Sequence, residues 1–469
     1  MRLRTAQRSR ILSLLLVLAL VVAACGDGRD DGDDTSAEGD DDTDQPADDG
    51  NGGDDGGDDG EAAFTIDTEF CATDPASVGI EGDTITFGTS LPQSGLYAAF
   101  AEILRGEQAY FSYVNEELGG VEINGNQYRI ELLAKDDAYQ ADQTVTNVDQ
   151  LVQDDGVFAL FNVVGTRNNL AIRDFVNEEC VPNLFAATGS PAWGNRDYPW
   201  ILGTGLVPYS IEMQAFVDYL TETKPDATIA VLRANDDFGR AYSDTLRALT
   251  EGTDMTIVQE ETYDPEGADV AAQVTSLAAT NADAWVLGAT LLGCPTALRE
   301  ADAAGWSPII YMSGTCTSKT LMNAAAEAGD GVISVSPAID PNDPQYASDE
   351  DLVLYNEKIA QYSPEADPTN GIVVYGWVAA AALVETLQRI EGEPTRLSLM
   401  QAARTLEVSD LPMMVPGATW SVSEDDWFLG EQFNLVQFSF ADGFFKPLGE
   451  LRSYDDQTEE ITPDDLING

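Results

Sequence analysis

The chain contains no histidine. This absence removes the commonest zinc ligand and makes a Ser-His-Asp triad impossible. No CxxC spacing and no G-x-S-x-G elbow occurs, and the glycine-containing stretches at 203–208 and 314–320 depart from the dinucleotide and phosphate-loop patterns. The adjacent carboxylates Asp136 and Asp137 would point to opposite faces of a strand, which favours a structural role over acid–base work. We therefore expect no catalytic residue, no metal and no cofactor, and a secreted enzyme is only the remote alternative.

Basic residues are scarce. The chain has 23 Lys and Arg against 82 Asp and Glu, a formal charge of −59, and only five of the basic residues are lysines. Such an excess of negative charge argues against nucleic acid and anionic lipid surfaces as partners. It also suggests adaptation to high salt, where screening relieves self-repulsion.

The N-terminus predicts export. Four arginines precede an apolar run over 11–22, and Ala23 and Ala24 then lead to Cys25. A basic region, a short apolar region and small residues describe a secretory signal peptide over 1–24, and the run is short for a membrane span of ~20 residues. The last residues resemble a bacterial lipobox, in which Cys25 becomes lipidated. We expect an extracytoplasmic protein anchored to the cell membrane by lipid; the alternative is an ordinary signal peptide with an incidental cysteine.

Residues 25–63 are dominated by Asp and Gly, and no aromatic residue occurs before Phe64. Such a segment cannot bury enough apolar surface to offset chain entropy, so we expect a disordered acidic tether, extended by its like charges. Weak calcium binding is the alternative, but the spacing matches no defined cation loop. A lead-in segment over 64–82 follows.

Four cysteines remain after Cys25, and an exported chain with an even number favours disulfides. Three pairings are possible. We favour Cys71–Cys180 and Cys294–Cys316, because the second pair lies at the ends of two consecutive predicted strands.

The rest of the chain alternates two periodicities. Continuous apolar runs at 157–161, 229–232, 284–287 and 309–312 suit strands buried on both faces of a parallel sheet, and helical spacing appears between them. This alternation predicts an α/β fold with right-handed crossovers. The length exceeds that of one usual core, so we expect two lobes. Crossings between them are indicated by the breaks at 203–208 and 337–344 and, more weakly, near Gly430.

Several motifs stand in a familiar order. A strand at 85–88 leads into a Ser-Gly turn at 91–95, and glycine pairs with Asn-Gly follow over 119–125. Further motifs lie at 165–169, 181–189 and 235–239. Together, from about residue 85 to about residue 451, they resemble the leucine/isoleucine/valine-binding family of type I periplasmic binding proteins.

This resemblance implies two Rossmann-like lobes joined by three crossovers that close on a small-molecule solute. It places the first lobe at 83–206 plus 340–432 and the second at 207–339 plus 433–469. It also implies delivery of the solute to an ABC permease by a monomer. The alternative is a sensor of the same fold that signals to a membrane kinase.

Ligands of open α/β sheets bind beyond the carboxyl ends of strands, where helix N-termini attract a carboxylate. Three strand-to-helix turns of the first lobe fit this description, and the resemblance adds to the expectation for Thr166 and Thr188; helix capping is the alternative role. The aromatic side chains after the first turn, and Trp193 if it is not in the core, are candidate walls. The candidates are Ser94, Gly95, Tyr97, Phe100, Gly165, Thr166, Ala187 and Thr188.

The second lobe offers Phe238 at another such turn, and Asp236 either as a ligand contact or as a helix N-cap. The resemblance places an acidic side chain, which pairs with a ligand ammonium, in the loop after strand 309–312. Here that loop offers Thr315 as a candidate ligand contact but contains no carboxylate. A buried ammonium without a counter-charge is costly, which favours an amine-free acid, an aromatic acid or an amide. If Asp236 supplies the charge, an amino acid remains the expectation.

Overall fold

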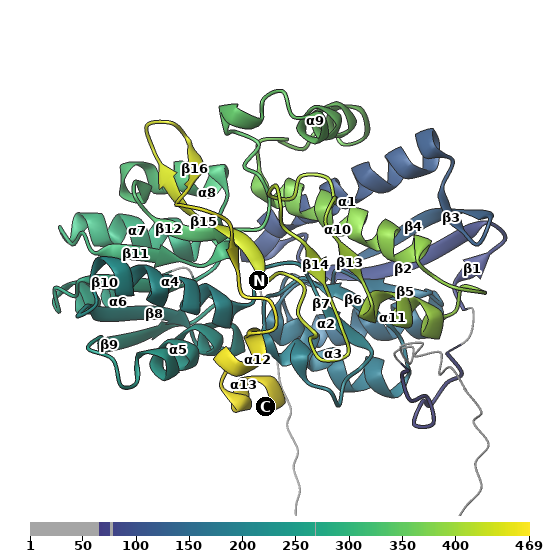
Figure 1. The fold of residues 1–469 in the computed structure, drawn as a ribbon, viewed down its shortest axis with the longest axis horizontal. Coiled ribbons are helices and arrows are strands. Elements are labelled where there is room, and N and C mark those ends of the chain that lie inside the picture. Colours follow the sequence, from purple (N-terminus) through teal and green to yellow (C-terminus); the bar gives the residue numbers. More distant parts are fainter. Residues whose placement is uncertain (1–64, 76–77, 268) are drawn as a thin grey trace, which may run out of the picture. The chain divides into compact units, whose positions relative to one another are not determined.

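The computed structural model describes residues 65–75, 78–267 and 269–469 (Figure 1). The predicted leader, the lipidation site Cys25 and the tether lie outside the described residues. Residues 62–469 form one compact unit.

The first sheet is built from the N-terminal half of this unit, and its strand order is β3-β4-β2-β5-β6-β7, with β1 beside β2. β2 pairs in parallel with β4 and β5, and the parallel ladder continues through β6 to β7. The strands are β1 (Ile80–Glu81), β2 (Thr84–Leu91), β3 (Val121–Ile123), β4 (Asn126–Asp136), β5 (Ala159–Phe161), β6 (Asn183–Ala186) and β7 (Ile201–Gly203).

The second sheet has the order β16-β15-β12-β11-β10-β8-β9, and β17 pairs with β15. β9, β8, β10, β11 and β12 are parallel, whereas β15 returns from far along the chain and pairs antiparallel with β12 (Figure 1). The strands are β8 (Thr228–Ala234), β9 (Thr256–Tyr263), β10 (Ala284–Gly288), β11 (Ile309–Met312), β12 (Ile333–Ser336), β15 (Gln432–Ser439), β16 (Phe444–Pro447) and β17 (Arg452–Ser453).

Helices connect the parallel strands, as the alternating periodicity predicts. Those between strands of the first sheet are α1 (Ala101–Tyr113), α2 (Ala141–Asp149) and α3 (Thr166–Glu178). Those of the second are α4 (Tyr209–Thr223), α5 (Asp237–Thr250), α6 (Ala271–Ala278), α7 (Gly293–Ala303) and α8 (Lys319–Ala325). The later helices are α9 (Glu350–Tyr362), α10 (Gly371–Gln388), α11 (Arg396–Arg404), α12 (Thr458–Ile461) and α13 (Asp464–Asn468), and β13 (Glu407–Val408) pairs with β14 (Trp420–Ser421).

The helix α10 brings residues that follow β12 of the second sheet back to the first lobe, because it packs against α1 and β3. Gly376 makes this close approach possible: a Cβ there would lie 2.0 Å from the carbonyl oxygen of Ile103. α10 is long and apolar enough to span a membrane, but 78% of it is buried inside the protein. It is therefore a core helix of this fold.

Each predicted apolar run overlaps an observed strand, and its residues are buried except Ile309 and Ile310, which are partly buried, because helices cover both faces. Both predicted disulfides are present. Cys71–Cys180 ties the lead-in segment to the residue just beyond α3, and Cys294–Cys316 joins the start of α7 to the turn after β11.

Candidate ligand pocket

One pocket of about 140 Å³ is lined by residues that follow strands of the first sheet, by residues of the second sheet and its turns, and by the crossover at 337–343. It lies at the carboxyl ends of parallel strands, the edge at which α/β sheets bind ligands. A protein cavity of ~150 Å³ takes up a benzene molecule, so the pocket has the size for a small solute.

On the side of the first sheet, Gly165 and Thr166 form the wall at the start of α3. Gly165 has a φ of 103°, and a Cβ there would lie 2.6 Å from the Tyr139 ring, so glycine is required on both grounds. The hydroxyl oxygens of Thr166 and Thr188 lie 2.7 Å apart. Ala187 lines the pocket, whereas Thr188 is buried behind Thr166.

An aromatic stack extends this wall. Tyr97 stacks on Tyr139 with 4.1 Å between ring centroids, and Phe100 lies parallel to Tyr97 at 6.4 Å. Phe100 and Tyr139 line the pocket. Tyr97 lies behind them, and its hydroxyl donates a 2.6 Å hydrogen bond to the carbonyl of Pro265, in the loop after β9. Burial raises the pKa of Tyr97 to about 12.

On the side of the second sheet, Phe238 and Tyr209 form an edge-to-face pair with centroids 5.0 Å apart, and both line the pocket. Thr315 lines it from the turn after β11, where its hydroxyl lies 2.9 Å from that of Ser313.

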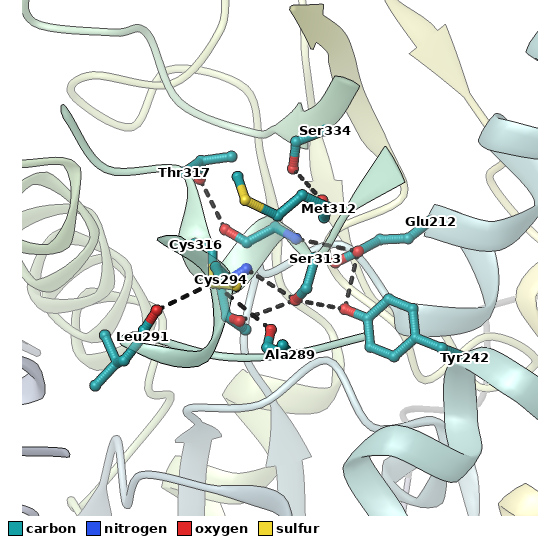
Figure 2. The surroundings of a disulfide bond; sticks show 12 residues. Glu212, Tyr242, Ala289, Leu291, Cys294, Met312, Ser313, Cys316, Thr317 and Ser334 are labelled. Carbon is teal, nitrogen blue, oxygen red and sulfur yellow. Dashed lines mark hydrogen bonds between the residues drawn. A yellow bond between two sulfur atoms is a disulfide. The ribbon is translucent and has the colours of Figure 1, made fainter. Parts of the chain in front are cut away.

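The carboxyl of Glu212, in the first turn of α4, also lines the pocket. Its side chain is 2% exposed, and Oε2 accepts hydrogen bonds from Tyr242 Oη (2.9 Å), Tyr311 Oη (2.8 Å) and the Gly314 N–H (3.1 Å). Figure 2 shows this carboxyl beside Tyr242 and the turn after β11. Burial raises the pKa of Glu212 to about 8, and the three hydrogen bonds oppose the rise.

Lys319 is the basic residue of the lining. The other four lysines of the chain form ion pairs with carboxylates of described residues: Lys135, Lys224, Lys358 and Lys446. Lys319 instead donates a 2.8 Å hydrogen bond to the Asn342 side chain of the crossover.

Three predicted ligand contacts lie elsewhere. Ser94 and Gly95 are exposed in a turn whose N–H groups bind the Asp136 carboxylate, and they do not line the pocket. Asp236 is the N-cap of α5 and accepts a hydrogen bond from the Gly239 N–H, the alternative role weighed for it. Trp193 belongs to a hydrophobic cluster under the first sheet. Ligand contact by these residues, as by those that line the pocket, remains a prediction.

Sequence reasoning missed Glu212, Tyr139 and Tyr209. The signal for Glu212 was present: a single carboxylate stands in the otherwise apolar or neutral run 207–217, directly after a predicted lobe crossing. No group of three metal-ligating side chains occurs within the described ranges.

Two α/β lobes joined by crossovers, with one small pocket shared by both sheets, define a two-lobed solute-binding protein. The chain belongs to the periplasmic binding protein family, whose model matches residues 84–443. Its fold is that of the type I members, as the resemblance predicted.

Curated and solved proteins agree with this assignment. A Leu/Ile/Val-binding protein homolog from Brucella melitensis biotype 1 is 25% identical over 206 residues, which are 44% of this chain and about half (54%) of that relative. A branched chain amino acid ABC transporter protein from Thermus thermophilus with bound valine superposes with a TM-score of 0.71 at 17% identity, covering 81% of this chain and 99% of that one. An ABC transporter solute binding protein from R. palustris in complex with benzoate superposes with a TM-score of 0.66 at 18% identity, covering 79% of this chain and 96% of that one.

Proposed function

We propose that the protein is the solute-binding lipoprotein of an ABC importer, which captures a small amino-acid-like, carboxylate or amide solute between its lobes. The observation that carries the proposal is the pocket itself. Its walls come from the starts of α3 and α4, on different sheets, so a bound solute would contact both lobes at once. Contacts made by both lobes favour the closed arrangement over an open one.

The chemistry of the walls supports a solute with one polar end. Thr166, with the first N–H groups of α3, suits a carboxylate. Phe100, Tyr139 and Phe238 supply apolar surface around it. The valine and benzoate of the two solved relatives are both carboxylates of this size, which agrees with such a pocket.

Delivery to a permease and lipid anchoring through Cys25 complete the proposal. They rest on the family and on the predicted leader. A sensor that signals to a membrane kinase would use the same pocket, and no feature of the pocket favours it.

The test is a thermal-stability screen in molar salt, on protein unfolded and refolded to remove carried-over ligand. The panel holds branched-chain amino acids, aromatic and aliphatic carboxylates, and small amides. A solute at a hundred times its Kd adds ~2.7 kcal/mol to the free energy of unfolding, which moves the midpoint by a few degrees. If no solute of the panel raises the midpoint, the proposed function is wrong.

A further inference from the structure

The loop at 313–316 lacks an acidic side chain, but the pocket does not lack a carboxyl. Glu212 reaches this loop from α4, and its Oε2 is bound by the hydroxyls of Tyr242 and Tyr311 and by the Gly314 N–H. These donors come from α5, β11 and the turn after β11, so three elements fix the carboxyl in one orientation. The loop at 313–316 therefore has a carboxyl beside it, which Glu212 provides from α4.

We propose that Glu212 binds the protonated amine of the ligand, and that the solute is a small amine-bearing molecule. This inference rests on the proposed function, because it concerns the same pocket.

The two oxygens of Glu212 have different surroundings. Oε2 accepts all three hydrogen bonds, and no described residue donates one to Oε1. A carboxylate oxygen can accept more than one donor, so Oε1 has capacity for a ligand N–H. Because Glu212 lines the pocket, a ligand can reach it.

Gly314 leaves room for this oxygen. A Cβ on residue 314 would lie 2.9 Å from Glu212 Oε1 and 3.1 Å from Val335 Cγ2, so a larger residue would displace the carboxyl. The turn is held by the Cys294–Cys316 bridge and by Ser313 Oγ, which lies 2.8 Å from Tyr242 Oη (Figure 2). The disulfide is thus a positioning element for Glu212.

The charges around Glu212 also favour a cationic ligand group. Glu212 forms no ion pair with a Lys or Arg of the described residues, and the titratable groups that contact its carboxyl are the hydroxyls of Tyr242 and Tyr311. The charged groups of α5 (Asp237, Arg240, Asp244 and Arg247) form no hydrogen bond or ion pair with it, and Lys319 of the pocket lining donates to Asn342. A buried carboxyl without a counter-charge is costly when ionised, and it stays protonated. An ammonium would supply the counter-charge, and the carboxyl proton would then leave to the solvent.

The other acids near the pocket are already engaged. Asp340 Oδ1 accepts the Asn342 N–H, and its Oδ2 accepts the Phe445 N–H. Asp343 caps the turn at Gln345. Asp236, the acid considered from sequence, caps α5 and does not line the pocket. Among the described carboxyls that line the pocket, Glu212 is thus the one with an oxygen, Oε1, that accepts no hydrogen bond.

The experiment compares matched probes that differ only in the amine: leucine with 4-methylpentanoate, and phenylalanine with 3-phenylpropanoate. Titration calorimetry at pH 7 in two buffers of different ionisation enthalpy gives the affinity and the number of protons released. We expect the amine-bearing probe of a pair to bind more tightly and to release close to one proton per ligand, because the pKa of about 8 leaves Glu212 protonated in the empty pocket.

The variant Glu212→Gln should weaken the amine-bearing probe by roughly 30-fold more than it weakens the amine-free probe, and it should abolish proton release. The control is Glu107→Gln, which makes the same change at a buried carboxyl of α1 that does not line the pocket. Asp236→Asn tests the rival acid. The number of protons that wild-type protein releases on binding tests the inference even if a variant fails to fold.

Tight binding of the amine-free probes alone, with no proton release, would overturn the inference and leave the proposed function intact. Failure of every amine-bearing probe to bind would overturn it as well. Failure of the whole screening panel would refute the proposed function.

Discussion

The hydroxyl of Tyr97 donates a hydrogen bond to the backbone carbonyl of Pro265, with 2.6 Å between the oxygens. Tyr97 follows β2 of the first sheet, and Pro265 follows β9 of the second, so this bond joins the two lobes at the edge of the pocket. It uses no ligand atom. We therefore expect it to favour the closed arrangement whatever the solute is.

Tyr97→Phe removes this bond and keeps the ring that stacks on Tyr139. A hydrogen bond contributes about 1 kcal/mol, so we expect solute affinity to fall about fivefold. Calorimetric titration with the solute found in the screen measures the change. Tyr110→Phe is the control, because Tyr110 packs on Trp377 away from the pocket. Equal affinity of both variants and wild type would contradict the role of the bond.

Replacing Thr166 and Thr188 together by alanine should weaken binding of a carboxylate solute by about 2 kcal/mol or more. The two hydroxyls lie within 2.7 Å of each other, so a single substitution leaves one of them to compensate. Thr386→Ala, in a buried turn of α10, removes a threonine hydroxyl without touching the pocket. An unaltered Kd in the double variant would refute carboxylate binding at this turn.

Reducing agent should lower the melting temperature in two separable parts. Chain-entropy estimates give about 3 kcal/mol for a loop of the Cys294–Cys316 length and about 5 kcal/mol for that of Cys71–Cys180. Pairwise serine variants, measured by thermal denaturation with and without reductant, separate the bridges. Mass spectrometry that finds four free thiols in the untreated protein would exclude both.

Glu431 should make stability fall as the pH rises. Burial, and then the charge of Asp426, raise its pKa to about 9 from an ordinary value of 4.5. Between these pH values the folded chain holds a proton that the unfolded chain releases, so the free energy of unfolding decreases from about pH 4.5 to about pH 9. Glu431→Gln, which cannot ionise, should show a smaller decrease in urea unfolding measured across this window. The exposed Glu450→Gln should match wild type; a Glu431→Gln curve parallel to wild type would contradict the prediction.

Cys25→Ser tests the anchor. If Cys25 is lipidated, the variant should appear in the medium or in the soluble fraction, whereas wild type sediments with membranes and partitions into detergent. Blotting of the fractions measures this. Cys71→Ser, which also removes one thiol, should stay with the membrane. Retention of Cys25→Ser on the membrane would exclude the lipid anchor.

The fold was predictable because its signals are local. Continuous apolar runs mark β5, β8, β10 and β11, and the change to helical spacing marks the helices between them. The turns that carry Thr166 and Phe238 follow from the same order, since parallel strands put their carboxyl ends at one edge.

Glu212 could not be assigned in that way. Its partners Tyr242 and Tyr311 stand 30 and 99 residues further along the chain, and no local pattern links them to α4. The turn of Ser94 and Gly95 shows a second limit of sequence reasoning. Its strand-to-helix motif was recognised, but such a motif does not specify which way the turn faces. Tertiary packing decides both the partners of Glu212 and the direction of this turn.

The Cys71–Cys180 bridge also determines what a protease can do to this protein. It closes a covalent ring that contains β1 to β5 and all of α3. A single backbone cut anywhere in that ring leaves whatever precedes Cys71 attached to everything beyond Cys180. Release of the lobes by a cut within or before this ring would therefore require either cleavage before Cys71, or a cut inside the ring together with reduction of this bond.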